Sequence, residues 1–459
     1  MFEVNLEKYQ SLFREYGELR LQCNKGASIN LMNGDVQMNH SGSSAGISVR
    51  LGRGGIWGFS SAAESSEDVI KKCFIKAEER YSWLAGKQNQ ELLPYAVEAW
   101  QGEYLFRAKN PAMSSSTRLE FLRELDNYLV TKYPDISMRS LTIASTDVEK
   151  KFINSAGGNF HLNRPLYYLV VNLATSRGGE PISLYNVFSG MGFPQDELGA
   201  AKNYYAELDE LYEHLRKKSE GVYARPGIQD VVLDADLAGI LSHEAIGHTT
   251  EADIVLRGSV AGDLMGEKVA SELVTLVDIA HSYDGKLCQV PVFVDDEGVQ
   301  AKDAVIIENG IMKNFMHSRA TAQKLGMEPL GNARAYGYSD EPLVRMRNTM
   351  ILPGTSKLED MIADVKDGYY LIKSSNGQAD TTSEFMFGVV LGYEIKNGKL
   401  GKAIKDMTIS GVAYDVLKSV TAISDDYKFN LGTCGKKQQI SVGMGGPAIR
   451  CRVNIGGQQ

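Results

Sequence analysis

The stretch FMFGVVLGYEIKNGKLGKAI, residues 385–404, consists of two apolar runs separated by Asn397-Gly398. Asn-Gly between apolar runs is a strong short-range signal for a β-hairpin, because both residues tolerate the positive φ of a type I′ turn. The same pattern surrounds Asn309-Gly310 in AVIIENGIMKNFMH, residues 304–317. Strands here follow one another directly instead of alternating regularly with helices, which predicts an α+β fold with antiparallel sheets.

Further elements are predicted on both sides of a break near residue 220. Strands are expected at 27–39, 45–62, 137–157, 165–176, 230–235, 273–280, 290–298 and 438–455. Helices are expected at 5–20, 65–85, 116–133 and 197–218, where apolar residues recur at helical spacing. Gly221 and Arg225-Pro226-Gly227 interrupt the pattern. We therefore expect an N-terminal α+β domain at 1–220, with an antiparallel sheet and long helices, and a C-terminal domain at 221–459 dominated by antiparallel sheet.

Composition limits the classes of function. The net charge of -8 and the pI near 5.6 argue against direct nucleic-acid binding, which normally shows a basic excess. No apolar run approaches the length of a membrane span, and the charged N-terminus lacks the features of a secretory signal, so no membrane association is expected. Five scattered cysteines argue against a disulfide framework and fit a reducing cytoplasm.

One stretch in the second half contains closely spaced histidines. In LSHEAIGHTTEAD, residues 241–253, His243 and His248 bracket Glu244 and lie five residues apart. At about 100° per residue, a regular α-helix places these imidazoles roughly 140° apart, too far to hold one metal ion together. A metal site at this stretch therefore requires a distortion of the helix.

A π-type turn, with its wider repeat, would bring both histidines to one side of the helix. Gly247, immediately before the second histidine, makes such a break inexpensive. We therefore predict a helix from Leu237 to Asp253, carrying the metal motif, with a non-α irregularity around Ala245 to His248.

Glu244 falls on the apolar stripe of this predicted helix. Burial of an unpaired carboxylate costs several kcal/mol or forces its protonation, so Glu244 needs a partner. One interpretation is a metal site, and the other is a core pair with His248 or with an arginine. Spacing alone leaves both interpretations open.

Two further places can supply metal ligands. Cys434 lies between Gly432 and Gly435, and a nearby Lys436 or a metal would favour its thiolate, the form that ligates. The alternative is an ordinary small buried residue. The acidic run Asp295–Glu297 can bind a divalent cation, although carboxylates at a strand end commonly form a solvated turn.

HEAIGHTTEAD resembles the H-E-x-x-x-H motif of the TldD/PmbA family. The resemblance continues in order through GEKVASELVTLVD (266–278), DDEG (295–298), IENGIMKNFMHSRATAQKLG (307–326), GNARAYGYSDEPLVRMRNTMILPG (331–354), NGQADTTSEFMF (376–387) and GTCGKKQQISVGMGGP (432–447). In the first half, GISVRLGRGGIWGFSS is similar to the family's glycine-rich strand pair. TldD-like members carry the metal motif and the cysteine of GTCG, whereas PmbA-like (TldE-like) members lack them. Both are present here.

The resemblance implies one Zn²⁺ per chain, with His243, His248 and Cys434 as ligands and Glu244 as general base. Two nitrogens, one sulfur and an open fourth position are typical of a catalytic zinc. The implied activity is hydrolysis of short or unfolded polypeptides, bound in extended form in a cleft. The glycine-rich SVGMGG, residues 441–446, either exposes backbone to such a substrate or is a tightly packed strand.

The family resemblance also bears on partners. It implies a two-chain particle, formed with a second copy or with a PmbA/TldE-like partner. The family's older description as modulators of DNA gyrase gives the alternative function, a non-catalytic regulatory protein that acts through protein contacts. Ser375-Asn376 and Ala379 depart from the family pattern and put substrate preference in doubt. Arg319, Arg334 and Arg345 are candidates to hold substrate carboxylates or carbonyls, although most arginines are structural or solvated.

Overall fold

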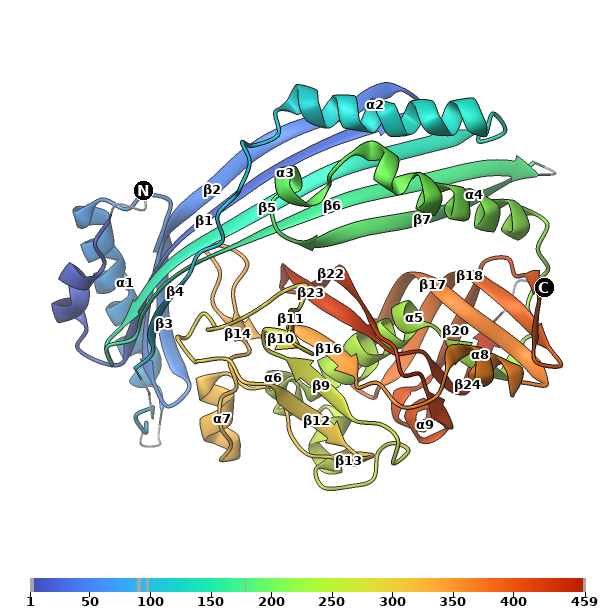
Figure 1. The fold of residues 1–459 in the computed structure, drawn as a ribbon. Coiled ribbons are helices and arrows are strands. Elements are labelled where there is room, and N and C mark those ends of the chain that lie inside the picture. The colour runs from blue at the N-terminus through green and yellow to red at the C-terminus, as the bar shows by residue number, and fades with distance from the viewer. Residues whose placement is uncertain (1–3, 89–91, 96–98, 178, 457–459) are drawn as a thin grey trace.

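The first half of the chain forms a long arched sheet that lies over the second half (Figure 1). The computed structural model describes residues 4–88, 92–95, 99–177 and 179–456. The arched sheet contains β1 (Gly17–Met32), β2 (Asp35–Arg53), β3 (Ile56–Ala62), β4 (Gln101–Tyr104), β5 (Met138–Asn154), β6 (Asn159–Arg177) and β7 (Glu180–Met191). Its order is β3-β2-β1-β5-β6-β4, with β7 also paired to β6. The β4–β6 pair is parallel and the other pairs are antiparallel.

The sequence signals explain most of this sheet. The predicted strands at 27–39, 45–62, 137–157 and 165–176 all lie in it, and a turn at Asn33-Gly34 joins β1 to β2. β1, β2, β5 and β6 are 16 to 19 residues long, well above the usual strand length of about 5–6 residues. These long strands give the sheet the reach to cover the second half.

The predicted helix at 5–20 is wrong. A 3-10 turn, η1 (Glu7–Leu12), is followed directly by β1. Leu19 and Leu21 alternate with polar residues along β1 and are fully buried on one face of the sheet. Pairing of β1 with both β2 and β5 stabilises the extended form, so long-range contacts outweigh the local helical pattern.

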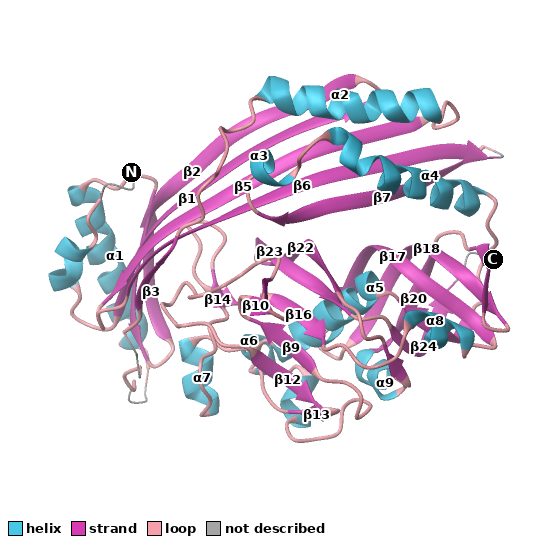
Figure 2. Cartoon of the chain, in the orientation of Figure 1, coloured by secondary structure: helices cyan, strands magenta, loops and turns pink. Residues whose placement is uncertain are grey.

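Helices cover parts of the arch. α1 (Glu67–Ala85) packs against β2 and β3, and α2 (Ser115–Lys132) packs against β1 and β5 on the outer side of the arch (Figure 2). Both helices were predicted, at 65–85 and 116–133. The helix predicted at 197–218 begins later, as α4 (Tyr205–Ser219), which packs against β6 and β7. Before it, α3 (Pro194–Glu197) and η2 (Ala201–Tyr204) are separated by Gly199, whose φ of +62° ends the helical geometry.

The second half contains two sheets. One has the order β13-β12-β9-β16-β23-β22, and the other β17-β8-β24-β20-β18-β19, with β21 on β24. β17 also pairs with β18, so β17, β8, β24, β20 and β18 form a closed ring. The strands are β8 (Gly227–Leu233), β9 (Leu276–Ile279), β12 (Ala304–Glu308), β13 (Ile311–Met312), β16 (Asn348–Ile351), β17 (Asp367–Ala379), β18 (Glu384–Lys396), β19 (Lys399–Ala403), β20 (Met407–Val412), β21 (Ala422–Ile423), β22 (Lys428–Lys436), β23 (Gln438–Gly446) and β24 (Ile449–Gly456).

Short elements complete the second half. The remaining strands form two small hairpins, β10 (Ser282–Tyr283) with β11 (Lys286–Leu287) and β14 (Ala333–Arg334) with β15 (Leu343–Val344). The helices are α5 (Ala235–Ile240), η3 (Leu241–Gly247), η4 (His248–Thr250), α6 (Ala252–Val255), η5 (Val260–Leu264), α7 (Arg319–Leu325), α8 (Leu358–Ala363) and α9 (Ala413–Lys418). The pairs β16–β23 and β8–β17 are parallel, and the other strand pairs of this half are antiparallel.

The α+β class with mainly antiparallel sheets is confirmed, and so are both Asn-Gly hairpins. Asn309 and Asn397 have φ of 47° and 49°, and each connects two paired strands. The strand predicted at 290–298 is wrong, since this segment is a loop with only an isolated bridge from Val294 to Gln300. Its carboxylates accept backbone N–H groups, and these bonds replace a strand ladder.

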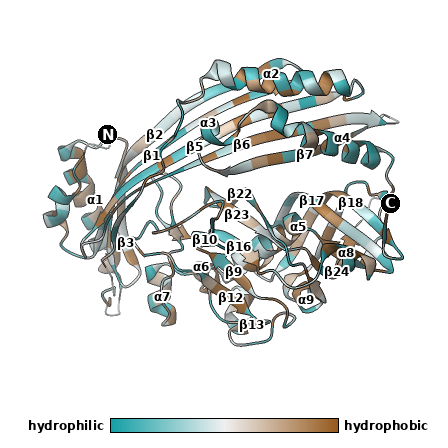
Figure 3. Ribbon diagram, viewed as in Figure 1, coloured by the Kyte–Doolittle hydropathy of each residue, from teal (hydrophilic) through white to brown (hydrophobic). Residues whose placement is uncertain are grey.

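The two halves share packing. Leu391, Tyr393 and Ala403 from the second half belong to the same apolar cluster as α2, α4 and the middle of the arched sheet. Figure 3 shows apolar bands along the strands of both halves. The last helix that packs on the arched sheet, α4, ends at Ser219, and the first strand of the second half, β8, begins at Gly227. The division into domains at residue 220 stays a prediction. Within the described residues, no helix has the length and apolar character needed to cross a membrane.

Candidate metal centre

The histidine motif lies on a helical segment with three successive geometries. α5 is followed by the π-helix η3, then by the 3-10 turn η4, and the backbone N–H of His248 donates to the carbonyl of His243. The predicted irregularity is therefore confirmed, and it begins earlier than expected, at Leu241. A Cβ on Gly247 would lie 2.0 Å from the sulfur of Met346, so any larger residue there would require the Met346 side chain to move.

This geometry brings the two histidines to one side. Their ring centroids are 5.3 Å apart. Cys434 belongs to β22, and its Sγ lies 3.2 Å from His248 Nε2. One ligand atom from each of His243, His248 and Cys434 lies within 4.8 Å of the other two. Among the described residues, this is the single group of three or more His, Cys, Asp or Glu side chains with the spacing to hold a metal ion.

The donor set fits a bound metal. Both ring nitrogens of His243 are buried and lack a hydrogen-bond partner in the described part of the chain. Buried side-chain nitrogens nearly always have partners, so an imidazole without a hydrogen-bond partner beside a cysteine sulfur fits a metal ligand. Two imidazoles and one thiolate suit zinc, with one coordination position left open.

The electrostatics also favour metal binding. Burial raises the pKa of the Cys434 thiol, but His243 and His248 outweigh this effect and lower the pKa to about 4. Cys434 is therefore a thiolate near neutral pH, the form that ligates. Burial lowers the pKa of His248, but Glu251 and Cys434 outweigh it and hold the pKa well above its usual value.

Glu244 faces open space beside the ligands. Its carboxylate oxygens lie 3.6 Å from His248 Nε2 and 4.0 Å from His243 Nε2, and its side chain is 24% exposed. It lines two cavities, of about 580 Å³ and 480 Å³, which also share Gly377 and Thr433. The two cavities therefore meet at Glu244 and form one cleft across the candidate site.

Side chains that are not candidate ligands themselves hold the candidate ligands in position. Glu251 is fully buried, and its carboxylate lies 2.8 Å from His248 Nδ1 and 3.1 Å from Lys436 Nζ. Burial raises the pKa of Glu251, but His248 and Lys436 outweigh it and hold the pKa below its usual value. Arg345 donates from Nη2 to the carbonyl of Cys434 at 2.7 Å. These contacts fix the orientation of His248 and the backbone at Cys434.

The three arginine candidates are buried and bonded to protein carbonyls. Arg345 donates to Cys434 and Gln438, Arg334 to Met346 and Ser441, and Arg319 to Glu297. Arg334 and Arg345 thus occupy the carbonyls of β23 at Gln438 and Ser441, and β16 pairs with 443–445. The backbone of 441–446 is therefore used within the protein, which identifies this segment as a packed strand.

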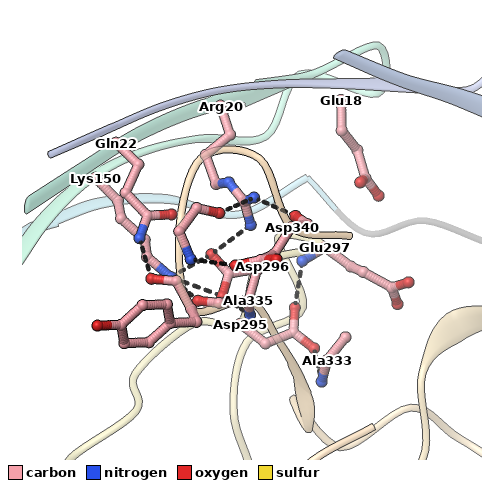
Figure 4. Close-up of polar contacts among 12 residues, drawn as sticks. Glu18, Arg20, Gln22, Lys150, Asp295, Asp296, Glu297, Ala333, Ala335 and Asp340 are labelled. Atoms are coloured by element: carbon pink, nitrogen blue, oxygen red, sulfur yellow. Dashed lines mark hydrogen bonds and ion pairs between the residues drawn. The ribbon is translucent and has the colours of Figure 1, made fainter. Parts of the chain in front are cut away.

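The acidic run Asp295–Glu297 lies elsewhere, between its loop and the arched sheet (Figure 4). Asp296 is held by Lys150 at 2.7 Å and by Arg20 at 3.3 Å, and Glu297 is held by Arg50 at 2.5 Å. All three acids are 5% exposed or less, so the expected solvated turn is wrong. The run joins the two halves of the chain and takes no part in the metal cluster.

The sequence did not predict the side chains that orient the candidate ligands. The sequence patterns gave no role to Glu251, and the core-pair alternative assigned Glu244 to His248 or to an arginine instead. The spacing of three residues between His248 and Glu251 is the usable signal, because such residues face each other on a helical turn. Lys436 was expected to act on the thiol of Cys434, whereas its ammonium contacts Glu251 and Asp253.

Comparison with known proteins places this geometry in a family. Residues 226–457 match the model of the PmbA/TldA metallopeptidase C-terminal domain, and residues 17–80 match domain 1 of the same group. The chain belongs to the TldD/PmbA family. The C-terminal match contains all three candidate ligands and Glu244.

Relatives extend over nearly the full chain. A metalloprotease of Methanocaldococcus jannaschii is 33% identical over 97% of this chain and 98% of its own length. A zinc metalloprotease TldD homologue of Saccharolobus solfataricus is 26% identical over 98% of this chain and 99% of its own. The TldE structure of Thermococcus kodakarensis has a TM-score of 0.75 at 15% identity and covers 98% of both chains. A candidate modulator of a DNA gyrase from Thermotoga maritima has a TM-score of 0.74 at 18% identity, with 96% of both chains covered.

Proposed function

We propose that this chain is a zinc-dependent peptidase in which His243, His248 and Cys434 hold one Zn²⁺ and Glu244 is the general base. The observation that carries the proposal is the buried His243 imidazole, whose ring nitrogens accept or donate no hydrogen bond among the described residues and lie beside a cysteine of lowered pKa. The name zinc metalloprotease on a full-length relative supports the choice of metal.

The chemistry follows from the positions of the side chains. A bound zinc ion polarises the scissile carbonyl and makes water more acidic. Glu244, at 3.6 Å and 4.0 Å from the ring nitrogens of the two histidines, is placed to take a proton from the attacking water. The same carboxyl then delivers the proton to the leaving amine. No covalent intermediate with the chain is needed.

The cleft favours an extended substrate. β22 is the last strand of its sheet, and residues 374–379 of β17 pair with β18 but not with β8. Both segments line the cleft together with Glu244. A peptide lying between them can pair with exposed strand edges, which accepts an unfolded chain and rejects a folded one.

Cleavage of an unstructured fluorogenic peptide tests this function. We expect a chelator to stop cleavage, zinc to restore it, and a tightly folded protein containing the same sequence to resist. Cleavage that survives chelation would contradict the metal-dependent mechanism. If zinc-loaded protein of confirmed fold cleaves no unstructured peptide, the non-catalytic alternative, a regulatory protein acting through contacts, replaces the peptidase.

Assembly and compartment are part of the proposal. The TldE relative in fold supports a two-chain particle, with a TldE-like partner or with a second copy of this chain. The five cysteines are free and buried, in keeping with a reducing cytoplasm. Sedimentation of the chain alone and mixed with a TldE-like protein tests the assembly, and a monomer in both samples would contradict it.

A further inference from the structure

Two facing pairs of side chains connect β22 to the helical motif. Cys434 and Lys436 are two residues apart on β22, so they point to the same face of the strand. Opposite them, His248 and Glu251 are three residues apart, and they contact each other at 2.8 Å. Cys434 Sγ lies 3.2 Å from His248 Nε2, and Lys436 Nζ lies 3.1 Å from Glu251 Oε1.

Three protein groups surround the ammonium of Lys436. Its Nζ donates to Asp253 at 3.0 Å and to the carbonyl of Val344, and it forms an ion pair with Glu251 Oε1 at 3.1 Å. Its side chain is only 15% exposed, although it lines the smaller of the two cavities. The ammonium therefore holds protein groups in place.

We propose that Lys436 is a positioning residue for the metal: it fixes the Glu251 carboxylate, which in turn fixes the imidazole of His248 opposite the sulfur of Cys434. The inference rests on the proposed zinc-binding role of His248 and Cys434. Lys436 and Cys434 belong to one strand, so the same contact also sets the spacing between β22 and the helical motif.

The physical reason is the environment of Glu251. Its side chain is fully buried, and besides the imidazole that it orients, Lys436 is the cation that forms an ion pair with it, with Arg345 as a further cation near it. Removal of the ammonium leaves Glu251 and Asp253 with unpaired negative charge at the site. Glu251 is then free to rotate away from His248 towards other donors. A carboxylate on the non-ligating nitrogen of a metal-bound histidine typically changes metal affinity by about 10–100-fold when it is lost.

The test compares Lys436→Met with Lys437→Met. Lys437 is the adjacent, exposed residue in the turn between β22 and β23, so the control makes the same chemical change one position away. Zinc affinity is measured by competition with a chromogenic chelator, and cobalt absorption reports the thiolate–metal bond. We expect Lys436→Met to weaken zinc binding by about 10–100-fold, Lys437→Met to leave it unchanged, and Lys436→Arg to restore most of it.

The outcomes separate this inference from the proposed function. If the parent chain binds no zinc, the proposed function fails first. If the parent binds zinc and Lys436→Met binds it within about twofold, the positioning role is wrong. If Lys436→Met does not fold, the test uses Glu251→Gln and Lys436→Arg instead. Weaker zinc binding in Glu251→Gln together with parent-like zinc binding in Lys436→Arg supports the positioning role. Parent-like zinc affinity in Glu251→Gln overturns it. Where all variants fold, a double-mutant cycle of Lys436→Met with Glu251→Gln must show coupling, because additive effects would mean that Lys436 does not act through Glu251.

Discussion

Two of the buried groups of ionisable side chains differ in how well protein partners satisfy them. Around Asp296, two cations and a backbone N–H contact one carboxylate. Around His243, both ring nitrogens are buried without a partner, and the nearest charged groups are Glu244 and the Cys434 sulfur. Both regions offered ligands for a metal in the sequence. Among the described residues, only the region around His243 has candidate metal-ligand atoms that protein partners leave free to bind an ion.

The difference shows that a binding site is identified less by its residue types than by whether its buried polar atoms have hydrogen-bond or ion-pair partners within the protein. Buried charges that form ion pairs connect parts of a fold, and here they connect the arched sheet to the loop at 293–300. Buried polar atoms left without partners carry a large energetic cost, which a bound ligand removes. The following experiments should therefore affect metal binding in one region and stability in the other.

The largest effect should come from loss of a ligand. His243→Ala and Cys434→Ser each remove one of three protein donors, so we expect zinc to be lost and peptide cleavage to fall by at least ~10³-fold. Cys73→Ser, the same change at a buried cysteine of α1, should keep both. Zinc content and cleavage are measured on the same preparations. Full zinc in Cys434→Ser would show that the sulfur is not a ligand.

The next largest effect separates catalysis from binding. Glu244→Gln should keep zinc, because this carboxylate is a base and not a ligand, but lose roughly 10²–10⁴-fold in cleavage rate. Steady-state kinetics on an unstructured peptide, together with metal analysis, provide the readout. A variant that cleaves like the parent would assign the proton transfer to another group.

A substitution around Asp296 should lower stability and leave zinc binding unchanged. Lys150→Met leaves Asp296 with Arg20 as its remaining cation, and breaking a buried pair costs about 3–5 kcal/mol of unfolding free energy. Zinc affinity should stay unchanged. Denaturant unfolding gives the stability, with the exposed Lys72→Met of α1 as a control expected to change it by less than about 0.5 kcal/mol. Loss of zinc in Lys150→Met would show that the two regions are coupled.

The smallest expected effect is a pH dependence of stability. Burial raises the pKa of Asp296, but Lys150 and Arg20 outweigh it and lower the pKa to about 2 from 3.8. This carboxylate therefore stabilises the fold above pH 3.8, and the contribution, about 2 kcal/mol, is lost as the pH falls from about 4 to 2. Unfolding measured across this range should show the decline, and Lys150→Met should show a shallower one. Equal slopes in both proteins would contradict the assignment.

Much of the site was predictable from local sequence. The five-residue spacing of His243 and His248 is incompatible with a shared ligand on an α-helix, so a metal site at this stretch predicts a π segment, whereas the spacing alone left a core pair open as well. The Asn-Gly turns fixed two hairpins, because few residues adopt positive φ without strain. The position of Cys434 opposite the histidines came from family resemblance, since no local rule connects residues 186 positions apart.

Other features depend on contacts that a local pattern does not contain. Residues 17–20 belong to the helix predicted at 5–20, but pairing with two distant strands makes them part of β1. The run Asp295–Glu297 looks like a solvated turn until Arg20, Arg50 and Lys150 approach from the arched sheet. The contact between Lys436 and Glu251 likewise exists only because β22 crosses the helical motif.

Metal analysis of the parent chain, purified without chelator and supplied with zinc, tests the central claim most directly. We predict about one zinc per chain in the parent and none in His243→Ala, with both proteins equally folded by circular dichroism. This result would assign the unpartnered imidazole to a metal. A folded parent chain that holds no zinc, or a His243→Ala variant that holds as much zinc as the parent, would contradict it.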